Sequence, residues 1–363
     1  MQRLVPFVLL FLLLGAAIAY TTFRLWHILP LAKGWKWAVA CLWVMCFLLM
    51  FPSFKFRDTI PLALGTVTYE VWTSWLIAFL YVLLIFLALD LGRLVHIVVP
   101  KTFMFNSLQG TSAVMGLVTL ILVCGGIHYH HKYREEITIQ TDKTLEKPLK
   151  IVLASDLHAG YHNRAKELRR WVGLINAEKP DLVLIAGDLV DGHMRPVIEW
   201  NYASIFREIE APVYACLGNH EYIGGADEAR SFLDSAGITL LKDRAVMDKG
   251  IRIIGRDDLS NPCRAALWEL FQPDSTFTIV LDHQPYNLGQ AQEAGADFQF
   301  SGHTHHGQVW PGNWVTDAMF EKAFGPYQKG DTRYYISSGL GIWGGKFRIG
   351  TRSEYVVLTV RPR

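Results

Sequence analysis

Four long apolar runs before residue 130 constrain this chain more than any other feature of its sequence. They are Leu4–Phe23, Trp37–Phe51, Val71–Leu89 and Gly110–Ile127. A membrane-spanning helix needs about 20 apolar residues, with a range of about 17–25, and only Trp37–Phe51 must borrow flanking residues to reach that length. Helices of a soluble core are seldom apolar on every face over such a length. The sequence therefore predicts a transmembrane region of about four helices over residues 1–127.

The first apolar run has a second interpretation, because Arg3 precedes it and Ala17-Ile18-Ala19 resembles a signal-peptide cleavage site. The run is long and further apolar runs follow it, so we favour an uncleaved membrane helix. With four spans, the N-terminus and the C-terminal half lie on the same side of the membrane. Lys and Arg residues flank the spans on both sides, so the positive-inside rule does not tell which side carries the C-terminal half.

The charge and the cysteine content argue against two other kinds of site. A formal net charge of +2 without a basic, aromatic-rich stretch does not suit nucleic-acid binding, so no nucleic-acid partner is expected. The five cysteines include no CxxC pair, and three of them lie in the apolar runs. A cysteine-type zinc site is therefore not expected.

Residues 128–149 are polar and charged, and they are predicted to connect the membrane region to a soluble domain over residues 150–363. In that domain short apolar strands alternate with amphipathic helices, which is an α/β pattern. The helices are expected at Arg164–Ala177, Val197–Ile209 and Asp227–Ala236. The strands are expected at Lys150–Ala154, Asp181–Ala186, Pro212–Leu217, Ile238–Leu241, Ala245–Met247, Ile251–Ile254, Thr276–Leu281, Phe298–Phe300, Tyr334–Ser337 and Tyr355–Val360.

Metal-competent side chains follow five of these predicted strands at the point where each strand ends. They are Asp156 and His158, then Asp188, then Asn219, then His283, and finally His303 and His305. Open α/β sheets bind ligands just beyond the carboxyl ends of their strands. The last two residues belong to Gly302–Gln308, which has three histidines within four positions, an arrangement that suits a metal-binding turn.

These seven residues offer oxygen and nitrogen ligands without a thiolate, which suits divalent Mn, Fe or Zn. In an extended backbone Asp156 and His158 would point to one face, and His303 and His305 repeat that spacing. One ion seldom takes seven ligands, whereas two ions about 3.5–4 Å apart can share them, with Asp188 as a bridge. Such a pair of ions serves phosphoryl transfer, because it activates water and binds phosphate oxygens.

The same residues resemble a known family. Five motif blocks are similar to those of the calcineurin-like metallophosphoesterases, in the usual order: Asp156-Leu157-His158, Gly187-Asp188, Gly218-Asn219-His220-Glu221, His283 and Gly302-His303-Thr304-His305. The tail, Tyr334–Gly341 with Arg348-Ile349-Gly350, resembles a bacterial membrane-associated subgroup with N-terminal membrane segments. The resemblance implies a multi-pass protein of the bacterial cell membrane, whose α-helical membrane region precedes an α/β (α-β-β-α) sandwich with a binuclear metal centre.

The resemblance also implies a role for each motif residue. The first metal ion would be bound by Asp156, His158 and His305. The second would be bound by Asn219, His283 and His303, and Asp188 would bridge the two ions. His220 would be the catalytic residue that contacts the phosphate and protonates the leaving oxygen. Glu221 or Asp191 would orient a ligand, and a surface or helix-cap role is the alternative for both.

Two further histidines are candidates for substrate binding. His306 stands where related sequences usually have glycine, and we expect it to face the substrate. His162 is expected to line the pocket, although an ordinary loop histidine is the plainer interpretation.

Together these features predict a membrane-anchored bimetal phosphoester hydrolase, a phosphodiesterase or a pyrophosphatase, that uses a metal-bridging hydroxide. The membrane region suggests lipid-linked or envelope substrates, with membrane lipids as further partners. The alternative is a catalytically silent membrane sensor or scaffold with the same fold. The complete set of ligand-type residues disfavours that alternative.

Overall fold

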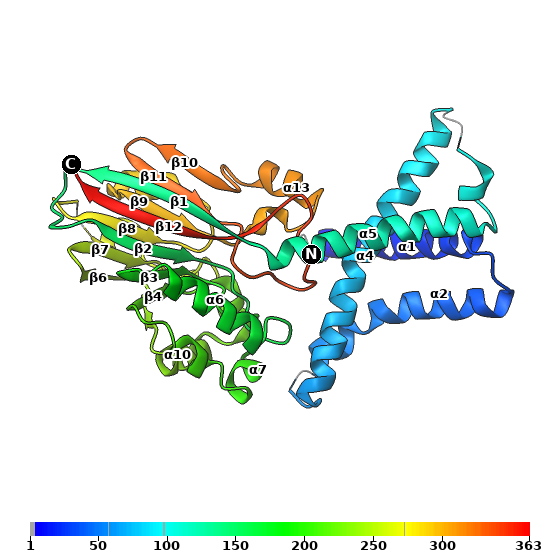
Figure 1. Ribbon diagram of the computed structural model, residues 1–363, viewed down its shortest axis with the longest axis horizontal. Helices are drawn as coiled ribbons and strands as arrows, with labels where there is room; N and C mark the ends of the chain where they lie inside the picture. The colour runs from blue at the N-terminus through cyan, green and yellow to red at the C-terminus, as the bar shows by residue number, and fades with distance from the viewer. Residues whose placement is uncertain (1–3, 57, 97–98, 272) are drawn as a thin grey trace. The chain divides into compact units, whose positions relative to one another are not determined.

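The computed structural model describes residues 4–56, 58–96, 99–271 and 273–363. The chain divides into two compact units, Met1–Gly126 and Ile127–Arg363 (Figure 1). Arg3, on which the signal-peptide interpretation partly depends, lies outside the described residues.

The described part of the N-terminal unit consists of helices and the turns between them. Its elements are α1 (Leu4–Ile28), α2 (Lys33–Leu48), α3 (Met50–Lys55), α4 (Leu62–Leu94), the 3-10 turn η1 (Lys101–Phe103) and α5 (Leu108–His130). Four segments are long and apolar enough to cross a membrane, namely Phe11–Ile28, Lys33–Lys55, Leu62–Leu94 and Leu108–His130. The prediction of four apolar helices is therefore confirmed. The second reaches spanning length because α2 continues into α3.

An aromatic cluster packs three of these helices together. The rings of Trp43 and Trp75 meet edge to face with centroids 5.3 Å apart, and Phe79 stacks on Trp75 at 5.1 Å. Ile18 of α1 completes the cluster. Many large apolar side chains outside it are exposed, for example Leu12 at 65%. An apolar surface of this kind marks contact with lipid rather than water.

One group of charged residues lies near the ends of α1 and α4. Arg24 is 4% exposed, and its Nε lies 3.4 Å from Oδ2 of Asp90. The hydroxyl of Tyr20 donates to the same carboxylate oxygen at 2.5 Å. The two opposite charges are paired, as ionisable groups in apolar surroundings generally are.

The C-terminal unit contains two six-stranded sheets. The first has the order β1 (Lys132–Thr141), β12 (Ser353–Pro362), β2 (Leu149–Ala154), β3 (Leu182–Ala186), β4 (Val213–Cys216) and β5 (Thr239–Leu240). The second has the order β10 (Gly325–Lys329), β11 (Thr332–Ile336), β9 (Phe298–Ser301), β8 (Phe277–Leu281), β7 (Ile251–Gly255) and β6 (Arg244–Asp248). Strands β2 to β5 run parallel, and so do β7, β8, β9 and β11. The carboxyl ends of the parallel strands therefore share one edge of each sheet.

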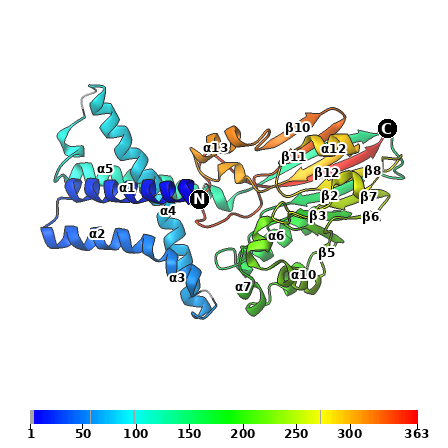
Figure 2. The same ribbon diagram turned by 180° about the vertical axis from the view of Figure 1, so that it is seen from behind.

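Helices cover the outer faces of both sheets (Figures 1 and 2). Alternate residues of β2 show how the layers form, because Leu153 faces the core between the sheets whereas Val152 faces Trp171 of α6. On the second sheet, Val280 packs against Ala291 of α12. This order of layers confirms the predicted α-β-β-α sandwich. The helices and helical turns of this unit are α6 (Ala165–Ala177), α7 (Met194–Glu199), α8 (Ala203–Phe206), α9 (Asn219–Gly224), α10 (Ala226–Ser235), α11 (Leu267–Leu270), α12 (Gly289–Ala294), η2 (His305–Gly307) and α13 (Gly312–Met319).

Two segments differ from the expectation. The stretch predicted as a connector contains β1, which pairs in parallel with β12 along ten residues. One face of β1 is exposed to solvent, while Ile139 on the other face is buried. Because half of its residues face solvent, the strand is as polar as a linker and was predicted as one. The single helix expected at Val197–Ile209 is two short helices, because Asn201 between them has φ of 50°, a left-handed conformation that ends a helix.

Candidate metal centre

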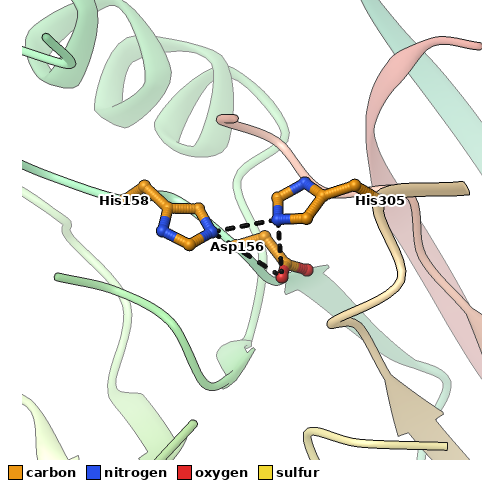
Figure 3. A group of neighbouring side chains, drawn as sticks. All are labelled: Asp156, His158 and His305. Carbon is orange, nitrogen blue, oxygen red and sulfur yellow. Dashed lines mark hydrogen bonds and ion pairs between the residues drawn. The ribbon is translucent and has the colours of Figure 1, made fainter. Parts of the chain in front are cut away.

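The first group of metal-competent side chains comprises Asp156, His158 and His305 (Figure 3). The two Nε2 atoms of His158 and His305 are 3.0 Å apart. Oδ1 of Asp156 lies 3.4 Å from Nε2 of His305 and 4.0 Å from Nε2 of His158. Residues from the end of β2 and from the turn after β9 thus meet, although about 150 residues separate them in the chain.

The second group comprises Asp188, His283 and His303, with Asn219 beside them. Nε2 of His283 lies 3.1 Å from Oδ2 of Asp188. Oδ1 of Asn219 lies 2.8 Å from Nδ1 of His303 and 3.2 Å from Nε2 of His283. These residues come from the ends of β3, β4, β8 and β9, so both sheets contribute.

Asp188 lies between the two groups. Its Oδ2 is 3.1 Å from Nε2 of His283 in the second group and 3.7 Å from Nε2 of His158 in the first. Its other carboxylate oxygen accepts the backbone N–H of His220 at 2.9 Å. The carboxylate is therefore held in a position from which it can contact ions in both groups.

The donor atoms fit two divalent ions. Adjacent ligand atoms around an ion with bonds of about 2.0–2.2 Å lie roughly 3.0–3.5 Å apart. The distances between these nitrogens and oxygens, from 2.8 to 4.0 Å, surround that range. Nδ1 of His158 faces Asp191 at 3.3 Å, and Nδ1 of His283 faces the carbonyl of Ala186 at 2.8 Å. Because an acceptor faces Nδ1 of each ring, Nε2 is the nitrogen that can bind an ion in the site.

The electrostatics of the site also favour a cation. Burial, together with His158 and Arg348, holds the pKa of His305 well below its usual value, so His305 is a neutral ligand-type imidazole. Burial opposes a charge on His283 too, but Asp188 outweighs it and raises the pKa of His283 well above its usual value. The site thus stabilises positive charge beside Asp188.

The backbone at the site is left-handed rather than extended. The residues with positive φ include Asp156 (54°), His158 (47°), Asp188 (51°), His303 (70°) and His305 (47°). The expectation that an extended backbone aligns Asp156 with His158 is wrong, because a left-handed turn brings them together. Such conformations cost of order 1 kcal/mol or more each and gather at functional sites. Hydrogen bonds hold them, for example from His303 N to Oδ1 of Asp156 at 3.0 Å.

Two glycines leave the space that this crowding requires. A Cβ at Gly302 would lie 2.2 Å from Oδ2 of Asp156. A Cβ at Gly187, where φ is +73°, would lie 2.7 Å from Nδ1 of His283. No larger residue fits at either position without displacing a ligand-type side chain.

Asp191 holds three histidine rings. Its carboxylate oxygens lie 3.3 Å from Nδ1 of His158, 3.4 Å from Nδ1 of His162 and 3.4 Å from Nδ1 of His220. Burial lowers the pKa of His220, but Asp188 and Asp191 outweigh burial and raise it to about 9. His220 therefore carries a proton at neutral pH.

Glu221 supports the backbone instead of a ring. Its carboxylate accepts N–H groups from Asp188 at 3.0 Å, Val190 at 2.9 Å and Gly218 at 2.7 Å. These bonds fix the loops after β3 and β4 in the position that presents Asp188. Asp191 faces the histidine rings, as the orienting hypothesis expects. Glu221 takes the alternative role of a helix cap at the start of α9, and it also fixes the backbone of Asp188.

The two histidines expected to bind substrate lie outside both ligand groups. His162 is 1% exposed, and its Nε2 lies 2.6 Å from the carbonyl oxygen of Ile342, so the expected pocket-lining position is wrong. The ring of His162 contacts Asp191 from the interior of the domain, with Nδ1 at 3.4 Å from Oδ2 of Asp191. His306 stacks on Phe324 with centroids 4.6 Å apart and lies 3.6 Å from Asp317, outside both groups described above.

Arg348, which the sequence singled out only as part of the tail motif, holds the metal-ligand turn from behind. It is fully buried, and its guanidinium donates to the carbonyls of His305 at 2.7 Å and Gly341 at 3.2 Å, to Oγ of Ser353 at 3.1 Å, and to the carbonyl of Ser338. It thereby ties the His305 turn to the C-terminal tail. An isolated arginine among glycines carries no sequence signal of such burial.

Comparisons with known proteins agree with this geometry. Residues 149–307 match the family described as calcineurin-like phosphoesterase. An uncharacterised metallophosphoesterase of Helicobacter pylori is 33% identical over 239 residues, which is 63% of this chain and 64% of that protein. One of Aquifex aeolicus is 30% identical over 63% of this chain and 92% of its own length. A bovine transmembrane protein with a metallophosphoesterase domain is 31% identical over 59% of this chain and 53% of its own length.

A fold of two sheets between helices, with oxygen and nitrogen ligands at their shared edge, defines a metal-dependent phosphoesterase. The chain belongs to the calcineurin-like metallophosphoesterase family. The family implies a binuclear centre of divalent ions and the hydrolysis of phosphoesters. The four apolar helices, together with the transmembrane relative, make the chain a membrane protein.

Proposed function

We propose that this protein is a multi-pass, membrane-anchored phosphoester hydrolase of the bacterial cell membrane with two ions of Mn, Fe or Zn. The observation that carries the proposal is the position of Asp188 Oδ2, 3.1 Å from His283 and 3.7 Å from His158. Asp156, His158 and His305 would hold one ion, and Asn219, His283 and His303 the other. Bound there, such ions activate water and neutralise phosphate charge.

His220 is the proposed catalytic residue. Its Nδ1 faces Asp191 at 3.4 Å, which leaves the opposite ring nitrogen to reach a phosphate or leaving oxygen. Because the carboxylates raise its pKa to about 9, it is protonated at neutral pH and able to give its proton to the departing alkoxide. Asp191 would fix both the ring orientation and the charge.

The substrate class follows from location alone. An active site joined to four apolar helices would have access to phosphodiesters or pyrophosphates of the membrane and the cell envelope, including lipid-linked ones. The reaction would then displace an alcohol or a phosphate group.

Turnover of an aryl phosphodiester tests the proposal directly. Purified full-length protein is stripped with a chelator and assayed with bis(p-nitrophenyl) phosphate, with and without added Mn²⁺. Activity is expected only with the metal, and Asp188→Asn is expected to lower it at least about 100-fold, since an amide lacks the charge that both ions share. Asp142→Asn, whose side chain is 70% exposed and pairs with Arg363, is the matched control and should be unchanged.

Two outcomes contradict the proposal in different ways. Activity that survives chelation or the loss of the Asp188 charge excludes the bimetal mechanism. Tight binding of two ions without turnover of aryl mono- or diesters favours the silent sensor or scaffold.

A further inference from the structure

The last turn of α5 ends inside the C-terminal unit at Tyr129. Its side chain is fully buried, and its hydroxyl donates to Oδ1 of Asn163 at 2.7 Å. Nζ of Lys132 lies 3.7 Å from the centre of the tyrosine ring and donates to the Tyr129 carbonyl at 2.8 Å. The apolar helix that qualifies as the fourth membrane span therefore finishes in a specific polar contact.

Asn163 in turn holds the loop that carries His158. It is fully buried, and its Nδ2 lies 3.0 Å from the carbonyl of Leu157, 3.2 Å from that of His158 and 3.0 Å from that of Ile342. Its own carbonyl accepts the N–H of Gly160 at 3.1 Å. The side chain and the main-chain carbonyl of Asn163 together hold the turn that follows Asp156.

The contact also reaches the tail on the other side of Asp156. Just before Ile342, the N–H of Leu340 donates to the carbonyl of Ser155 and that of Gly341 donates to the carbonyl of Asp156, both at 3.0 Å. Asn163 therefore joins the two segments between which Asp156 is held.

Three carbonyls fix the orientation of the Asn163 amide, and the tyrosine hydroxyl supplies the donor that this orientation requires. An amide offers two N–H donors on one side and an oxygen acceptor on the other. The side that faces three carbonyls must be the nitrogen, so Oδ1 faces Tyr129 and needs a donor. A phenylalanine at position 129 would keep the ring packing but leave Oδ1 buried without that donor.

We propose that Tyr129 and Asn163 are positioning residues for the metal-ligand loop, so that the affinity of the centre for metal depends on the last turn of α5. The inference rests on the proposed metal centre. Tyr129 acts through Asn163, which acts on the backbone of His158 and, through Ile342, on the segment beside Asp156. Neither residue touches the substrate.

The test is a titration of metal-free, full-length protein with Mn²⁺, followed by the electron paramagnetic resonance signal of the free ion. Tyr129→Phe is expected to weaken binding about three- to tenfold, the range of one buried hydrogen bond. Asn163→Ala is expected to weaken it about 10- to 100-fold, as losses behind a metal ligand typically do. Tyr355→Phe is the matched control, because it removes a buried hydroxyl that donates to Glu178 at 3.1 Å, away from both ligand groups.

Thermal unfolding of each variant is recorded beside the titration. A weaker Mn²⁺ affinity in Tyr129→Phe than in Tyr355→Phe, at similar melting temperatures, supports the positioning role. Equal affinities in the two variants overturn it, whatever their stability. Failure of the unmodified protein to bind two Mn²⁺ ions refutes the proposed metal centre instead, so the two failures are distinguishable.

Discussion

Replacing Arg348 with methionine tests how the His305 turn is held. Methionine fills a similar length with an apolar chain but donates no hydrogen bond. The carbonyls of Ser338 and Gly341 would lose their donor in the interior. The carbonyl of His305 keeps the N–H of Gln308 at 3.0 Å, and the hydroxyl of Ser353 can rotate toward another partner.

The expected loss of stability is the difference between two large effects. Two buried carbonyls without a donor cost roughly 2 kcal/mol each, about 4 kcal/mol together. Burial lowers the pKa of Arg348 to about 10, which corresponds to about 3 kcal/mol for holding its charge in the interior, and the variant recovers that cost. The net destabilisation is therefore about 1 kcal/mol, or a fall of roughly 2–4 °C in Tm for a domain of this size.

Differential scanning fluorimetry of full-length protein in detergent measures the shift. Arg361→Met is the control, because Arg361 is an exposed arginine on β12 and its loss should stay within about 0.5 kcal/mol. Arg348→Lys should fall between the two, since one ammonium group reaches fewer of the acceptors. If Arg348→Met and Arg361→Met have the same melting temperature, the Arg348 guanidinium makes no net contribution to stability and the reasoning above is refuted.

Two further variants test the site. In Asp191→Asn, His220 loses one of the carboxylates that raise its pKa to about 9. The proton of His220 should then leave at lower pH, and the alkaline limb of the pH–rate profile should move down by about 1 unit. An alkaline limb that does not move contradicts the role of Asp191. Gly302→Ala should reduce the affinity for Mn²⁺ at least about tenfold, because its Cβ would lie 2.2 Å from Oδ2 of Asp156. Gly173→Ala is the control, since a Cβ there has no atom within 4 Å, and it should bind Mn²⁺ as before. Equal affinities in the two variants would show that Asp156 has room to move.

The fold was predictable because its signals are local in the sequence. Apolar runs of spanning length leave a helix as the only way to satisfy the backbone in lipid. Buried strands that alternate with amphipathic helices indicate parallel sheets covered by helices. The strand β1 was missed because the prediction used local composition, and its solvent-exposed face makes β1 as polar as a connector.

The candidate site was predictable as a set of residues but not as a geometry. The ligand-type side chains stand at the ends of parallel strands, which meet at one edge whatever the loops do. The left-handed backbone of Asp156, His158 and Asp188 has no local signal in the sequence. Neither does the displacement of His162 behind Asp191, which depends on how two loops pack.

The sequence by itself determined that this chain has a helical membrane region and a phosphoesterase domain, because periodicity and motif order act along the chain. Only the tertiary structure decided that Asp188 lies between two groups, that Arg348 is buried under His305, and that Tyr129 ends against Asn163. The physical reason is distance along the chain. The partners of these contacts are 30 or more residues apart, and their approach is set by the packing of whole sheets and loops rather than by any local preference.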